Sequence, residues 1–248
     1  MMRITGIIIA KNEEEMIEDA LKSLSFCDEI LIVDNVSTDK TLEIALRYKA
    51  KIIKSKSTNF SELRNFGKEN ANGDYILYID ADERVDETLR KSILFEIKSN
   101  SSYSAYRINR KNFYLGNNEW PKIEKIERLF KKEKLTGWRG EIHESAVVDG
   151  DIGQIDGALI HFTHRNLSQM LKKSIEWSNT ESRIRIEANH PRMTWWRFPR
   201  VMVTTFLKSY VSEKGYKVGS AGLIEAIYQS YSTFITYAKL WELQNKKS

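Results

Sequence analysis

Short apolar runs alternate with amphipathic stretches over the first hundred residues of the chain. Runs rich in β-branched residues predict buried strands at 4–10, 29–34, 51–54 and 74–80, and each is followed by a segment with apolar residues at helical spacing. Such alternation is typical of a parallel sheet with helices on both faces. We therefore predict an α/β fold for residues 1–100.

Polar residues indicate where the helices of this region begin. Asn12, the segment Ser37 to Asp39, and Asp86 each precede an amphipathic segment, and their side chains are suited to cap its first turn. A further helix is expected from about Ser61 to Asn70, before the stop at Gly73.

The pattern changes after residue 100. Short strand-like runs at 103–109, 128–131, 142–148 and 158–162 are separated by turns that contain glycine. From Leu167 onward nearly every segment is helical, with interruptions at Pro191 and at 215–222. We predict a mostly parallel, Rossmann-like domain over 1–165, with halves 1–100 and 101–165, followed by a helical extension over 166–248.

Composition excludes some classes of protein and indicates the charge of a partner. The 248 residues are 41% hydrophobic with only 3 Pro and 12 Gly, which excludes a disordered or collagen-like chain. The 39 Lys and Arg exceed the 34 Asp and Glu and give a net charge of +5, which indicates an anionic partner without distinguishing nucleic acid, membrane and phosphorylated metabolite.

The single cysteine, Cys27, rules out an intrachain disulfide and a structural zinc site of several cysteines, and it indicates a reducing compartment. No apolar run reaches the roughly 18 to 20 residues of a membrane-spanning helix, and the start of the chain does not resemble a signal peptide. We expect a cytoplasmic protein.

An acidic pair, Asp80 and Asp82, follows the most apolar of the predicted strands. Side chains two residues apart in an extended segment point to the same side, so both carboxylates can face one point. Mg²⁺ or Mn²⁺ prefers oxygen ligands and keeps positions open for phosphates, so the pair predicts a metal-bridged diphosphate site. Two solvated turn residues are the alternative, but ligands of open parallel sheets bind where strands end.

Three ordered motifs carry a family resemblance. The runs IIIAKNEEEMIEDALKSL, EILIVDNVSTDKTLEIA and LRNFGKENANGDYILYIDADERV resemble the family-2 inverting glycosyltransferases of the GT-A fold. Further along, RLFKK, GWRGEIHESAVVDG, ALIHFTHRNL and TYAKLWE are similar to the branch that contains the lipopolysaccharide inner-core β-1,4-glucosyltransferases. The chain departs from the family pattern over Trp120 to Glu127, which leaves the acceptor open.

The resemblance implies a nucleoside-diphosphate-sugar donor, usually a UDP-sugar. The residues that it implies for donor binding are Ala10, Lys11, Asn12, Glu13, Asp34, Asn35, Arg64, Asp80, Ala81 and Arg128. Local structure offers other interpretations of some of them. Asn12 can be a helix cap and Asp34 a turn residue, while Arg64 and Arg128 can lie on a solvated surface.

The resemblance also implies a divalent metal whose ligands include a later histidine. By its order along the chain His161 is the candidate to join Asp80 and Asp82, with His164 in reserve and His143 as its rival. A lone histidine is more often structural than a ligand, so the third ligand stays open between them.

Inversion at the anomeric carbon requires one general base on the acceptor side, because the cation stabilises the departing diphosphate. Glu144 follows His143 in GEIHES and matches the family's His-Glu motif, so we predict that these two residues are catalytic, with Glu144 as the base. Glu141 is the alternative base, and an exposed acid at a strand end is the structural interpretation of Glu144.

The segment Pro191 to Val211 mixes aromatic and basic residues on one predicted helix, and a second apolar stretch runs from Leu223 to Leu243. This mixture suits an anionic membrane surface, although a helix that packs on the catalytic domain would show it too. Residues 191–243 therefore suggest a peripheral enzyme at the inner face of the cytoplasmic membrane, with a glycan or lipid-linked acceptor.

Three other functions compete. A sugar-phosphate nucleotidyltransferase is disfavoured because AKNEEE stands where such enzymes carry a glycine-rich basic loop. A nucleic-acid-binding protein is disfavoured because the predicted cleft is acidic, so no nucleic-acid partner is expected. A glycan-binding protein without activity is disfavoured by the intact Asp-Ala-Asp and His-Glu motifs.

Overall fold

The computed structural model describes residues 2–99, 101–140 and 144–246. The chain divides into two compact units. The first, the sheet unit, consists of Met1–Lys111 and Glu124–His161, and the second, the helical unit, consists of Asn112–Ile123 and Phe162–Ser248. Each is described by itself.

The main sheet has the strand order β3-β2-β1-β4-β8-β6-β11-β5, and β7 pairs with β6. Its strands are β1 (Ile4–Ala10), β2 (Glu29–Asp34), β3 (Lys51–Lys54), β4 (Tyr75–Asp80), β5 (Glu83–Val85), β6 (Ala105–Tyr114), β7 (Asn118–Glu119), β8 (Glu124–Lys131) and β11 (Ile152–Phe162). The block from β3 to β4 is parallel. Strand β8 pairs antiparallel with β4 and β6, β7 with β6, and β5 with β11.

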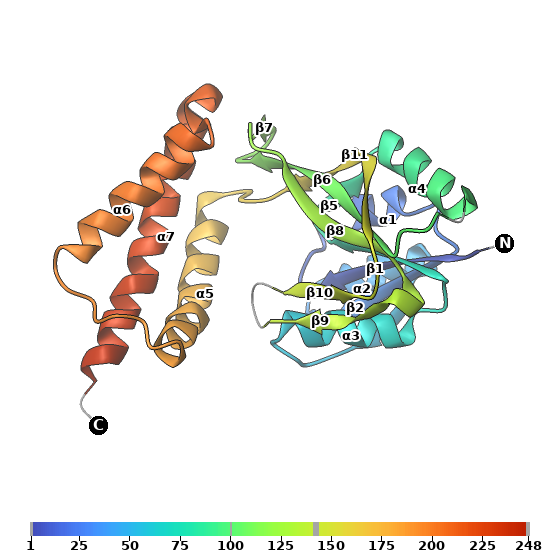
Figure 1. Cartoon of the computed structure of the whole chain (residues 1–248), viewed down its shortest axis with the longest axis horizontal. Helices are drawn as coiled ribbons and strands as arrows, with labels where there is room; N and C mark the ends of the chain where they lie inside the picture. Colours follow the sequence, from blue (N-terminus) through green and yellow to red (C-terminus); the bar gives the residue numbers. More distant parts are fainter. Residues whose placement is uncertain (1, 100, 141–143, 247–248) are drawn as a thin grey trace. The chain divides into compact units, whose positions relative to one another are not determined.

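Helices cover both faces of this sheet (Figure 1). Apolar residues of α1 (Ile17–Ser23), α2 (Thr41–Arg47) and α4 (Glu87–Ser99) join one buried cluster. Residues of α3 (Phe60–Asn70) and β9 (Leu135–Arg139) join the other. All seven residues of β1 are buried, so the central strand is covered on both faces, as its largely apolar sequence predicts. The predicted α/β fold is confirmed.

A two-stranded hairpin extends the second face. Strand β9 follows the short 3-10 helix η1 (Lys132–Lys134) and pairs with β10 (Ser145–Val148). The predicted strand at 142–148 therefore overlaps β10 in its described part. Residues 141–143, among them the two sequence candidates Glu141 and His143, lie outside the described residues.

The prediction that Asp86 caps a helix is confirmed, whereas the prediction that Asn12 caps one is wrong. The Asp86 carboxylate accepts a hydrogen bond of 2.7 Å from the backbone N–H of Leu89 in α4. Helix α1 begins only at Ile17, and Asn12 instead adopts a left-handed conformation with a φ of 55°. Its side-chain oxygen accepts from the N–H of Thr38, so asparagine serves here as a turn residue that ties two loops together.

The helical unit contains α5 (Leu167–Glu187), α6 (Arg197–Leu207), the π-helical turn η2 (Lys208–Ser212), the 3-10 turn η3 (Gly215–Val218) and α7 (Gly219–Asn245). Helix α7 packs against both α5 and α6. The predicted helical C-terminal region is confirmed, with interruptions near Pro191 and Gly215. No helix in the described part of the chain combines the length and apolar character that crossing a bilayer requires.

Candidate active site at the carboxyl ends of the parallel strands

Three neighbouring parallel strands end at one edge of the sheet. Strand β1 lies between β2 and β4, with Ala10 opposite Asp34 on one side and Ile9 opposite Asp80 on the other. Two predicted site residues, Asp34 and Asp80, therefore flank the end of β1. This edge is where open parallel sheets bind ligands.

The loops after β1 and β2 are tied to each other. The N–H of Asn12 donates to the Ser37 hydroxyl over 3.0 Å, and the N–H of Glu13 donates to the Thr41 hydroxyl over 2.8 Å. Lys11 is exposed beside them. The predicted donor-binding segment from Ala10 to Glu13 is thus held in a defined shape by the residues that follow β2.

Asp34 and Asn35 shape the same rim. Buried Asp34 accepts from the N–H of Ser37 over 3.1 Å, and the Asn35 amide donates to the carbonyls of Ser55 and Ser57. Both predicted residues therefore have structural partners, which agrees with the interpretation of Asp34 as a turn residue and leaves a role in binding as a prediction.

Two arginines hold the carboxylate of Asp80. Arg64 Nη2 donates to one oxygen over 3.2 Å and Arg128 Nη2 to the other over 3.1 Å. Burial alone would raise the pKa of Asp80, but Arg128 and Arg64 outweigh it and hold that pKa well below its usual range. Asp80 is therefore an anion at neutral pH, and Arg64 and Arg128 are buried residues instead of members of a solvated surface.

Arg64 also holds the predicted general base. Its Nε donates to Glu144 Oε1 over 2.8 Å, which joins a residue of α3 to one that stands 80 positions further along the chain. Burial alone would lower the pKa of Arg64, but Asp80 and Glu144 outweigh it and raise that pKa. One guanidinium thus fixes the distance between Glu144 and the end of β4.

Aromatic rings enclose this guanidinium. Its central carbon lies 4.8 Å from the ring centre of Trp138 and 5.5 Å from that of Tyr78. Buried Arg64 Nη1 and Arg128 Nε have no hydrogen-bond partner within the described residues. Unpartnered guanidinium donors of this kind can bind an anion such as phosphate.

The second aspartate of the acidic pair faces a histidine. Strand β11 pairs antiparallel with β5 and places His161 opposite Glu83, and His161 Nε2 lies 3.5 Å from Asp82 Oδ1. Burial alone would lower the pKa of His161, but the hydrogen bond that its ring donates to the Asp82 carboxylate outweighs burial and raises that pKa. The structure therefore brings together two of the three predicted metal ligands.

The donor set of this pair suits a divalent cation. A carboxylate and an imidazole are both ligands of Mn²⁺, and a carboxylate is a ligand of Mg²⁺. Within the described residues no group of three His, Cys, Asp or Glu side chains forms a complete metal cage. Asp80 contributes its oxygens to the two arginines, so its predicted role as a ligand would use the remaining lone pairs.

Three further charged residues belong to the site and are absent from the sequence-based predictions. Buried Glu83 accepts from the N–H of Asp80 over 3.0 Å, and Arg110 binds Glu83 over 3.2 Å and also binds Glu124. The sequence carries no clear signal for them, because Arg110 stands in the polar run NRKN of β6 and its buried partner Glu83 is distant in the sequence.

The other predicted residues lie as follows. Ala81 is buried between the two aspartates. His164 belongs to the helical unit, where its Nδ1 lies 2.9 Å from buried Glu225 and its ring stacks on Tyr114.

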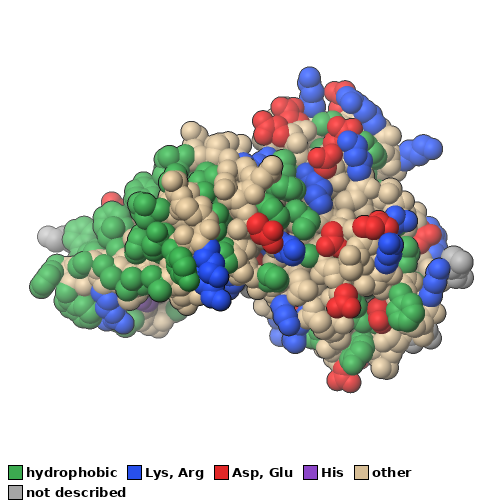
Figure 2. Space-filling model, turned by 90° about the horizontal axis from the view of Figure 1, so that it is seen from above, with side chains coloured by type: hydrophobic (Ala, Val, Ile, Leu, Met, Phe, Trp, Pro, Cys, Tyr) green, Lys and Arg blue, Asp and Glu red, His purple; other side chains and the backbone are tan. Residues whose placement is uncertain are grey.

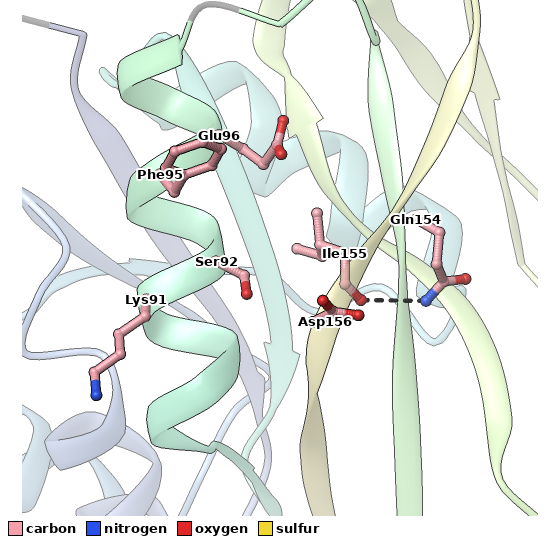
Figure 3. Close-up of a pocket in the computed structure, with 7 residues that line it drawn as sticks. All are labelled: Lys91, Ser92, Phe95, Glu96, Gln154, Ile155 and Asp156. Carbon is pink, nitrogen blue, oxygen red and sulfur yellow. Dashed lines mark hydrogen bonds between the residues drawn. The ribbon is translucent and has the colours of Figure 1, made fainter.

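A separate hollow of about 470 Å³ opens between α4 and β11 (Figure 3). It is lined by Lys91, Ser92, Phe95, Glu96, Gln154, Ile155 and Asp156. These side chains include none of the predicted site residues, so the chemistry described above lies elsewhere on the sheet unit.

A mixed sheet whose parallel strands lead to an acidic pair has the architecture of the GT-A glycosyltransferases. The profile described as Glycosyl transferase family 2 matches residues 5–176, which is more than half of the chain. The chain belongs to this family.

Relatives along the full length carry related names. A glycosyltransferase of Rickettsia typhi described as uncharacterized is 29% identical, covering 99% of this chain and 89% of the relative. The lipopolysaccharide core biosynthesis glycosyltransferase LpsC of Rhizobium meliloti is 25% identical, covering 96% and 92%. Among solved structures, glucosyl-3-phosphoglycerate synthase from Mycobacterium tuberculosis, crystallised with Mn²⁺, UDP and phosphoglyceric acid, is 17% identical with a TM-score of 0.48, covering 73% and 76%.

Proposed function

We propose that this glycosyltransferase inverts the anomeric centre as it moves a sugar, a hexose such as glucose, from a UDP-sugar to a glycan or lipid-linked acceptor. The product would belong to lipopolysaccharide or another cell-envelope polysaccharide. The observation that carries this proposal is the hydrogen-bond network of Glu144, Arg64 and Asp80. In it one buried guanidinium joins the proposed carboxylate base to the end of β4. The family membership favours glycosyl transfer over the nucleotidyltransferase alternative.

Glu144 supplies the base in this reaction. Arg64 requires only one of its two oxygens, and a carboxylate can accept a proton from an acceptor hydroxyl on the other. The acceptor oxygen then forms a bond to the anomeric carbon from the face opposite the diphosphate. The bond from that carbon to the diphosphate oxygen breaks, and UDP leaves with the electron pair. Because one displacement occurs, the configuration inverts.

The donor would lie along the ends of β1, β2 and β4. Ala10 to Glu13, with Asp34 and Asn35, form a polar rim that suits a uracil and a ribose, and Asp80 suits a ribose hydroxyl. The spare donor on Arg128 Nε suits a phosphate oxygen. The catalytic domain of this proposal is residues 1–165, with donor binding in 1–100 and acceptor binding in 101–165.

Asp82 and His161 would hold a divalent cation, Mn²⁺ or Mg²⁺, which when bound offsets the charge that develops on the leaving diphosphate. His143 remains the rival of His161 for this role. We also place the reaction at the inner face of the cytoplasmic membrane, where residues 191–243 would hold the enzyme near a lipid-linked acceptor.

The test uses purified protein, a panel of UDP-sugars and Mn²⁺, with slow UDP release as the first readout and the anomeric configuration of the product by NMR as the second. Glu144→Gln should lower UDP release at least a thousandfold while UDP binding by calorimetry is kept. Glu133→Gln, an exposed acid in the same unit, is the matched control and should behave as wild type. Normal turnover by Glu144→Gln would remove Glu144 from the role, and a retained configuration would refute inversion.

A further inference from the structure

The helical unit exposes more large apolar side chains than the sheet unit and buries fewer of them. The two large hydrophobic clusters consist of residues of the sheet unit. In the helical unit the buried positions of α5 are Met170 and three serines at helical spacing, Ser174, Ser178 and Ser182. Helix α6, which lies wholly within the described residues, buries no side chain completely. Serines thus fill most of the buried positions of α5. Although Tyr228 and Leu240 of α7 are buried, many large apolar side chains of this unit stay exposed.

The outer face of α6 shows this most clearly. Trp196, Val203, Leu207 and Val211 are all exposed and recur at helical spacing, so they form one apolar stripe along α6 and η2. Trp195, just before the helix, is 82% exposed. Exposing large side chains in this number is unfavourable in water, and a contiguous apolar patch of this kind marks an interaction surface.

Basic residues border the stripe. Between Glu187 and Glu213 the sequence contains four arginines and lysines and no acidic residue. Two of them, Arg197 and Arg200, lie over the ring of Trp196, with their guanidinium carbons 5.4 and 5.8 Å from its centre. The helical unit as a whole has 15 Lys and Arg against 7 Asp and Glu, a net charge of +8, whereas the sheet unit has 24 against 27, a net charge of −3.

A groove beside the stripe has the same character. It measures about 310 Å³ and is lined by His190, Arg197, Arg200 and Tyr237 among others. Two arginines that line one groove suit a phosphate group. Figure 2 shows that apolar side chains gather over the helical unit, with basic side chains among them.

We propose that the helical unit docks on an anionic phospholipid surface through the outer face of α6 and η2. The stripe of Trp196, Val203, Leu207 and Val211 enters the boundary between headgroups and acyl chains, with Trp195 beside it. Arg197, Arg200 and Lys208 meet the phosphates, and the groove holds one headgroup. This is the arrangement of an interfacial amphipathic helix, which combines an apolar face with a basic flank.

Charge distinguishes this partner from two others. A second copy of the unit would bring a net charge of +8 against +8, which opposes self-association at low salt. A nucleic acid would satisfy the basic residues, but it would leave the aliphatic stripe in water. An anionic lipid surface satisfies both. This inference rests on the membrane placement proposed above and deepens it by naming the surface and the lipid charge, and it does not depend on the chemistry at Glu144.

The experiment is flotation of the full chain with vesicles at low salt, read as a partition coefficient. Vesicles with one third phosphatidylglycerol in phosphatidylcholine should carry the protein to the top fraction, and pure phosphatidylcholine should carry at least tenfold less. Val203→Glu with Leu207→Glu should lower binding to the anionic vesicles at least tenfold. Arg200→Gln with Lys208→Gln should lower it about fivefold for each charge removed. Because all four side chains are exposed, both variants should fold, which circular dichroism checks.

The matched control is Phe95→Glu, since Phe95 is an exposed apolar residue of the sheet unit and its replacement should leave flotation unchanged. Failure of the wild-type chain to float with anionic vesicles would overturn the proposal. The proposal would also be overturned if Phe95→Glu reduced flotation as much as the α6 variants do. A stable dimer in light scattering that Val203→Glu converts to a monomer would overturn it too. Failure of glycosyl transfer with intact flotation would instead count against the proposed function alone.

Discussion

Arg64 is the residue on which the proposed site most depends. It is 2% exposed, and it binds both Asp80 and Glu144. Replacing it by methionine keeps most of its volume but removes the charge between two carboxylates. Breaking a buried ion pair by removing one partner typically costs about 3–5 kcal/mol. Because Asp80 keeps Arg128 as a partner, we expect the lower end of this range, a loss of about 3 kcal/mol in the free energy of unfolding.

Arg64→Lys separates charge from geometry. Lysine keeps the positive charge, but its ammonium cannot lie flat between Trp138 and Tyr78 while donating in two fixed directions. The unfolding free energy should therefore fall by about 1–2 kcal/mol. Displacement of the base by about 1 Å can cost a hundredfold in rate, so kcat of this variant should fall by about two orders of magnitude while it remains folded.

The assay is urea unfolding followed by circular dichroism, together with UDP release at a temperature where each variant is folded. Arg90→Met is the control, because Arg90 makes an exposed pair with Glu87 at 3.1 Å, and such pairs contribute less than about 1 kcal/mol. If Arg64→Met unfolded at the same urea concentration as Arg90→Met, the guanidinium would not hold the site together and the reasoning would be refuted.

Three other predictions follow from the structure. Asp82→Asn should weaken Mn²⁺-dependent binding of UDP at least tenfold in calorimetric titration, and an unchanged metal titration would contradict the cation site. Gly157→Ala should lower the free energy of unfolding in urea by more than about 3 kcal/mol, because its φ is +94° and the added Cβ would lie 2.1 Å from the backbone nitrogen of Leu89. Gly116→Ala is the control, since Gly116 has the same φ and no heavy atom lies within 4 Å of the added carbon. It measures the cost of the backbone conformation alone, which should be about 1 kcal/mol. Burial raises the pKa of the Cys27 thiol, so the native chain should react with a disulfide reagent at pH 8 far more slowly than the chain in urea, and equal rates would contradict this.

Much of the fold was predictable because it depends on local pattern. The run at 4–10 is β1 to the residue, since seven consecutive residues with no polar alternation require a strand buried on both faces. Asn12 shows the limit of such reasoning. The same side chain suits a helix cap and a left-handed turn, and only the Ser37 and Thr38 partners from the next loop select the turn.

The sequence was enough to predict most residues of the candidate site, but not the contacts between them. Asp82 and His161 stand 79 positions apart and meet because β11 pairs with β5, a register that periodicity does not specify. Arg64 and Arg128 had surface interpretations because sequence alone does not show that Asp80 lies between them. Glu83 and Arg110 were missed for the same reason, since each is justified only by the other.

The position of β11 in the sheet has a consequence for synthesis of the protein. This strand lies between β6 and β5, and it is the last strand of the sheet to be translated. A nascent chain that ends before Ile152 contains the acidic pair, but its Asp82 lacks the histidine that faces it in the finished protein. Because pairing of distant segments is slow compared with local helix formation, the acidic pair should emerge from the ribosome well before its environment is complete. The proposed active-site edge is therefore completed late in synthesis.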